Sequence, residues 1–215
     1  MAAASSNVGL TDLPTELRVK IAEYALSYEY GLCWRLNLNG RSGFRPSGLG
    51  TKNNKVPFNA FCRVSRQFWN DTRDIPFKVN AICIESLHSV PSFVRACTSD
   101  TCPSIRSASS ITLSLWMDAI SKPPPPEIHE IATIFPESKR FIQFEDWGFP
   151  DEGHCRVCDA DYFVGQGYEV QEWAQENSIS KLWHIRVPKL EAEEASKVRP
   201  TGMEEFELWM DKGVC

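Results

Sequence analysis

An apolar pattern with the period of an α-helix follows the small and polar residues at the start of the chain. The apolar positions recur at steps of three and four residues, at Leu13, Leu17, Ile21, Tyr24 and Ala25. Such spacing places them on one face of a helix, whereas Arg18 and Lys20 fall on the other side. Because Pro14 suits the first turn of a helix, the pattern predicts a helix over residues 14–27.

A second apolar stripe predicts another helix over residues 58–74. Pro76 should end it, because proline lacks the backbone N–H that a helix interior needs. Between these helices, residues 28–57 are rich in glycine and asparagine, which interrupt long elements. Within that stretch only residues 31–38 alternate enough to predict a strand. The N-terminal part is therefore expected to hold two helices separated by a long insertion.

Short apolar runs and helical patterns alternate along the rest of the chain. Strands are expected at residues 79–84, 110–116, 140–144 and 181–187, and helices at residues 90–97 and 127–135. The four prolines at residues 123–126 predict a stiff, extended bend. This alternation indicates an open α/β layer or a short irregular solenoid. We therefore expect an α+β protein, with a helical head followed by a mixed α/β region of alternating strands and helices.

Composition and charge limit the classes of function that we expect for this chain. The 215 residues are 42% hydrophobic and 24% charged, which is ordinary for a globular protein with a core. No apolar run approaches the roughly 20 residues that cross a bilayer, and the N-terminus lacks a secretion signal, so we expect an intracellular protein, cytoplasmic or nuclear, without a membrane partner. The net charge of −5 argues against a nucleic-acid binder.

That charge is unevenly distributed along the chain. Residues 1–80 hold eleven Lys and Arg against six Asp and Glu, whereas residues 81–215 hold twelve against twenty-two. A basic N-terminal part would suit an acidic partner surface. Two ordinary solvated faces explain the same distribution equally well.

The sharpest chemical cluster is formed by His154, Cys155 and Cys158. A Cys-x-x-Cys pair with an adjacent histidine offers three zinc ligands, but a structural zinc site needs four. No second Cys-x-x-Cys pair completes it, so we expect ordinary thiols here and no cofactor. All eight cysteines are expected to be free, because they are scattered through a chain without a secretion signal. Neither a phosphate-binding glycine loop nor a nucleophile motif occurs, so the chain is not expected to be an enzyme.

Two segments carry a family resemblance. Residues 10–21 read Leu-Thr-Asp-Leu-Pro-Thr-Glu-Leu-Arg-Val-Lys-Ile, and residues 62–69 read Cys-Arg-Val-Ser-Arg-Gln-Phe-Trp. Together they resemble the fungal F-box-like family, in which a Leu-Pro-x-Glu-Leu-Arg helix precedes a Val-x-Arg-Gln helix and a strand. The resemblance implies a disordered N-terminus at residues 1–9, an F-box-like head at residues 10–85 with an insertion at residues 28–57, and an α/β region at residues 86–215.

The resemblance implies a non-catalytic interaction role. F-box modules dock on the small adaptor subunit of cullin-RING ubiquitin ligases, while the rest of the chain acts as a substrate receptor. An apolar helix stripe presented to a groove fits this mode of docking. By analogy, the partner-binding residues would be Leu10, Leu13, Pro14, Leu17, Ile21, Val64 and Trp69.

Three alternatives stay open at this stage. The chain could be a free-standing interaction or regulatory protein that kept the F-box-like fold without the ligase contact. It could also be an enzyme with no recognisable local motif. Finally, both apolar stripes could simply pack on the C-terminal part of the same chain, as amphipathic helices usually do.

Overall fold

The computed structural model describes most of the chain between Gly9 and Arg186. The described residues are 9–36, 42–47, 63–99, 103–144, 156–186 and 208. Apart from Gly9, the predicted disordered N-terminus lies outside them, as does the first part of the helix expected over residues 58–74.

One six-stranded sheet organises the described part of the chain, with the strand order β2-β1-β3-β4-β5-β6. The strands are β1 (Leu32–Leu36), β2 (Ser42–Pro46), β3 (Ile82–Ile84), β4 (Ser110–Leu115), β5 (Lys139–Phe144) and β6 (His184–Arg186). Only β2 runs antiparallel to its neighbour. The predicted mixed α/β architecture is confirmed, and each of the predicted strands is present, four with shorter bounds and β5 with one residue more. The strand β2 was not predicted, because only residues 31–38 of the insertion alternate enough.

Helices connect these strands. They are α1 (Thr15–Ala25), α2 (Arg66–Thr72), α3 (Ile75–Val79), α4 (Val90–Thr98), α5 (Glu127–Ile134) and α6 (Arg156–Glu176), with short 3-10 helices η1 (Leu10–Asp12), η3 (Leu87–Ser89), η4 (Pro103–Ser107) and η5 (Met117–Ser121). The prediction that Pro76 ends a helix is wrong, because Pro76 lies in the first turn of α3. A missing N–H costs nothing there, since that group has no partner within the helix. Helix α6 was not predicted.

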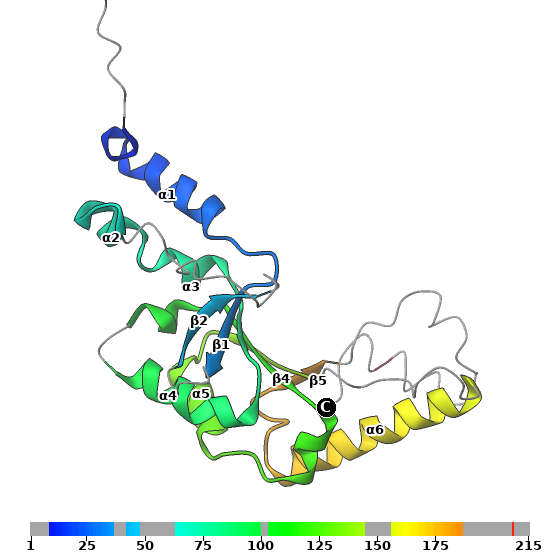
Figure 1. Cartoon of the computed structure of the whole chain (residues 1–215). Helices are drawn as coiled ribbons and strands as arrows, with labels where there is room; N and C mark the ends of the chain where they lie inside the picture. Colours follow the sequence, from blue (N-terminus) through cyan, green and yellow to red (C-terminus); the bar gives the residue numbers. More distant parts are fainter. Residues whose placement is uncertain are drawn as a thin grey trace, which may run out of the picture.

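The parallel strands follow one another in chain order, so each connection adds its strand on the same side of the sheet. Because such crossovers are right-handed, their helices lie on one face. Figure 1 shows α4, α5 and α6 beside the sheet, with α1, α2 and α3 at the end that carries β1 and β2. The predicted insertion therefore supplies two strands of a sheet that continues past residue 85.

The core lies between the sheet and these helices. Alternate residues of five strands, all except β2, are almost fully buried there, namely Leu32, Trp34, Ile82, Ile84, Ile111, Leu113, Leu115, Ile142, Phe144 and Ile185. Phe93 of α4 and Ile131 of α5 pack against them in the same cluster. The alternation of apolar and polar residues along these strands thus follows from burial of one face of the sheet.

The helical head has a separate small core and is joined to the sheet by Asn80. Ala22, Leu26 and Ile75 form this core. Asn80 is 2% exposed; its Nδ2 donates to the carbonyl of Leu26 at 2.6 Å, and its Oδ1 accepts from the backbone N–H of Tyr28 at 2.7 Å. One buried amide therefore holds the end of α1 at the start of the sheet.

The turn into β1 depends on a glycine. Gly31 has a φ of 73°, and a Cβ there would lie 2.4 Å from the carbonyl oxygen of Ala81. We expect Gly31→Ala to lower the free energy of unfolding by about 2 kcal/mol, because the strained conformation and the clash both penalise a side chain. Urea unfolding measures this. Gly43→Ala is the matched control, since a Cβ at Gly43 of β2 meets nothing within 4 Å; an equal loss in both variants would contradict the assignment.

Candidate docking surface on the helical head

Arg18 determines which side of α1 faces inward. Its side chain was predicted to lie on the solvent side, yet Arg18 is only 4% exposed. Its Nε and Nη2 donate to Oδ2 of Asp71 at 2.9 and 2.7 Å. Nη2 also donates to Oγ1 of Thr15 at 2.9 Å, and Nη1 donates to the carbonyl of Leu13. Arg18 thereby joins the start of α1 to α2.

With that side turned inward, the predicted apolar stripe of α1 faces solvent. Leu17 is 49%, Ile21 39% and Tyr24 90% exposed. The inner side is instead formed by Arg18, Ala22 and the half-buried Val19. We call Leu17, Ile21 and Tyr24 the docking ridge.

The other predicted partner-binding residues are distributed differently. Leu10 and Leu13 are half-buried at the start of the head, whereas Pro14 is exposed and its carbonyl accepts the first backbone hydrogen bonds of α1. Val64 is 56% and Trp69 44% exposed. All seven residues are therefore at least partly accessible.

Trp69 does not join the docking ridge. Gln67 and Asp71 face α1, because the Asp71 carboxylate accepts from Arg18 and the Gln67 amide lies beside the same guanidinium. Trp69 lies two positions from each of them, and residues two apart point to nearly opposite sides of a helix. Among its described residues, the head therefore exposes the ridge on α1, Trp69 on the far side of α2 and Val64 just before α2.

The surface around α2 is basic. Arg63, Arg66 and Arg73 are all exposed. Among the described residues, only Arg73 has an acidic neighbour within ion-pair distance, Asp74 at 3.7 Å. Positive charges beside exposed apolar side chains suit an acidic partner. Separately, burial raises the pKa of the Tyr28 hydroxyl, which lies just after α1.

The candidate metal ligands predicted from the sequence lie mostly outside the described residues. His154 and Cys155 lie outside the described residues, and Cys158 is described only as part of the backbone of α6. In the described part of the chain, no group of three His, Cys, Asp or Glu side chains is arranged to hold a metal ion. Cys33, Cys83 and Cys97 are not joined in disulfide bonds. A hydrogen bond with Cys83 lowers the pKa of Cys33, although burial acts in the opposite direction.

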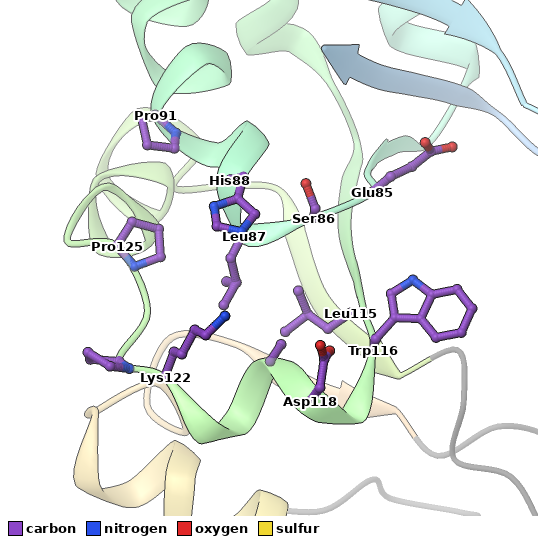
Figure 2. A pocket seen from close by; sticks show the side chains of 12 residues that line it. Glu85, Ser86, Leu87, His88, Pro91, Leu115, Trp116, Asp118, Lys122 and Pro125 are labelled. Atoms are coloured by element: carbon purple, nitrogen blue, oxygen red, sulfur yellow. The ribbon is translucent and has the colours of Figure 1, made fainter. Parts of the chain in front are cut away.

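A pocket of about 480 Å³ lies at the carboxyl ends of β3 and β4. Figure 2 shows the side chains that line it, including Glu85, His88, Leu115, Trp116, Asp118 and Lys122. These residues were not among the predicted site residues, because they come from two connections some thirty positions apart. Glu85 directly follows one predicted strand and Trp116 is the last residue of another. Those positions were the available signal, since ligands of open α/β sheets bind at the carboxyl ends of strands.

No protein-family model, no curated protein and no solved structure matches this chain. No helix among the described residues is both long enough and apolar enough to cross a membrane.

Proposed function

We propose that this protein is a non-catalytic interaction protein that docks through the ridge of α1 on the small adaptor subunit of a cullin-RING ubiquitin ligase. The proposal begins from the resemblance of residues 10–21 and 62–69 to F-box-like sequences. The observation that carries it is the exposure of Leu17, Ile21 and Tyr24 on a helix whose opposite side is held by Arg18.

The geometry fits helix-in-groove recognition, in which side chains at steps of three and four residues enter an apolar groove. Leu17, Ile21 and Tyr24 have that spacing. Because Arg18 holds α1 against α2, little ordering is needed on binding, which lowers the entropic cost of association. The exposed arginines of α2 would add electrostatic steering toward an acidic partner.

A binding measurement with the purified adaptor subunit tests this. We expect the wild-type chain to form a complex at micromolar concentration and the double variant Leu17→Asp/Tyr24→Asp to bind at least about 30-fold more weakly, the effect of removing central contacts of an interface. Both side chains are exposed, so the fold should be retained. Isothermal titration gives the affinity, and circular dichroism checks the fold.

Tyr30→Asp is the matched control, because Tyr30 is 63% exposed but lies outside α1. It should bind like the wild type. If the folded wild-type chain shows no complex, or if the ridge variant binds as well as the control, the docking proposal is wrong. In that case the alternative of a free-standing interaction protein is favoured, since it requires the fold but not the ligase contact.

A further inference from the structure

The pocket at the ends of β3 and β4 is a second place built to bind a ligand. Its wall on one side is the β3–α4 connection, and its wall on the other is η5 with the following prolines. The apolar part of the lining, which we call the floor, includes Leu87, Leu115 and Ala119. A volume of about 480 Å³ lies within the range of ligand-binding pockets.

Hydrogen bonds hold both walls in place. In the β3–α4 connection the hydroxyls of Ser86 and Ser89 are 3.1 Å apart. In the opposite wall, Trp173 Nε1 of α6 donates to the carbonyl of Lys122 at 3.3 Å, and Ser121 Oγ donates to the carbonyl of Asp118 at 2.7 Å. Such a pre-formed pocket loses little conformational freedom when it is filled.

The charged side chains are arranged on two sides of the floor. Figure 2 shows Lys122 and His88 toward Pro125, whereas Asp118, Trp116 and Glu85 lie toward the opposite side. Glu85 already forms an ion pair with Arg35, and this partner raises the pKa of Arg35 although burial alone would lower it.

Three of these groups remain available to a ligand. Within the described part of the chain, the side chains of His88, Asp118 and Lys122 form no hydrogen bond or ion pair. They are thus not paired as a nucleophile and its base, which is the arrangement that catalysis of that type needs. All three are exposed at the rim, so a long ligand can continue into solvent.

The geometry points to a peptide-binding pocket that takes a short segment with one acidic and one basic side chain separated by apolar residues. The acidic side chain meets Lys122 and His88, and the apolar part lies over Leu87 and Leu115. The basic side chain meets Asp118 beside Trp116, whose indole is 56% exposed and attracts cations to its face. A single chain segment supplies all three groups in this order.

A positional-scanning library of labelled synthetic octapeptides, applied to the full chain, tests the inference. We expect enrichment of peptides with an acidic and a basic residue flanking apolar positions. Lys122→Glu and Asp118→Lys should each weaken the selected peptide by about tenfold, because a like charge then faces the ligand. The double variant Lys122→Glu/Asp118→Lys should bind a peptide in which the acidic and basic residues are exchanged more tightly than it binds the selected peptide.

Lys181→Glu and Glu137→Lys are the controls, because both residues are exposed and neither lines the pocket. They should leave the affinity unchanged. Failure to enrich any such peptide, or equal binding by the wild type and both pocket variants, would overturn the inference. The ridge variant Leu17→Asp/Tyr24→Asp should bind the peptide normally, so loss of adaptor binding and loss of peptide binding remain distinguishable.

Discussion

Arg18→Met should lower the free energy of unfolding by about 3 kcal/mol, the loss expected when one partner of a buried ion pair is removed. The Arg18 and Asp71 side chains are 5% and 18% exposed. Without the guanidinium, the Asp71 carboxylate loses two donors, and the carbonyl of Leu13 loses one. Methionine replaces the aliphatic part of the side chain, so the loss reports mainly the polar contacts. Urea unfolding followed by circular dichroism measures it.

Arg73→Met is the matched control within the same helical head. The Arg73–Asp74 pair is 3.7 Å apart, and its side chains are 53% and 40% exposed. Removing such an exposed pair should cost less than about 1 kcal/mol. Similar losses in the two variants would show that Arg18 does not hold α1 against α2, and the orientation of the docking ridge would lose its explanation.

Arg18 also shows what an apolar pattern can and cannot predict. The spacing of Leu17 and Ile21 located α1 correctly, because helical period is a local property. Which side faces inward depends on a partner far along the chain. Asp71, 53 positions later, balances the charge of Arg18, and the small Ala22 packs in the core of the head. A rule based on residue type places arginine outside and leucine inside, and here both assignments are reversed.

The long helix α6 was missed for a different reason. The stretch of residues 156–176 contains two glycines, Gly165 and Gly167, and lacks a continuous apolar stripe. In the part of α6 whose side chains are described, residues 165–176, Val170, Trp173 and Ala174 pack in the core. These three positions alone are too few to predict a helix of this length from its apolar period.

The strands were easier to predict than the pocket. A sheet that buries one face imposes a two-residue period on each strand separately, so five of the six described strands could be recognised without knowing their neighbours, and only β2 was missed. The pocket depends on how β3 and β4 are placed side by side, which brings His88 and Lys122 to the same cavity. No pattern within either connection carries that information.

Phe93→Ala should lower the free energy of unfolding by about 4 kcal/mol, as expected for removal of a fully buried aromatic ring. Phe93 has no exposed surface. Its ring stacks on Phe135 at 5.9 Å and meets Trp34 of β1 and Phe44 of β2 edge-on, at 5.7 and 6.4 Å between centroids. One ring thus joins two strands from the predicted insertion to the helices of the α/β region, and unfolding should remain a single transition by both tryptophan fluorescence and circular dichroism.

Two controls separate this effect from general loss of an aromatic ring. Tyr24→Ala removes a ring that is 90% exposed and should change stability by less than about 0.5 kcal/mol. Phe93→Leu keeps most of the apolar volume and should cost less than Phe93→Ala. If Phe93→Ala unfolded in two separate transitions, the strands β1 and β2 would not share a core with α4 and α5. The sheet continues from β3 into β4 across residue 85, and with a shared aromatic core on its helical face the two parts must unfold together.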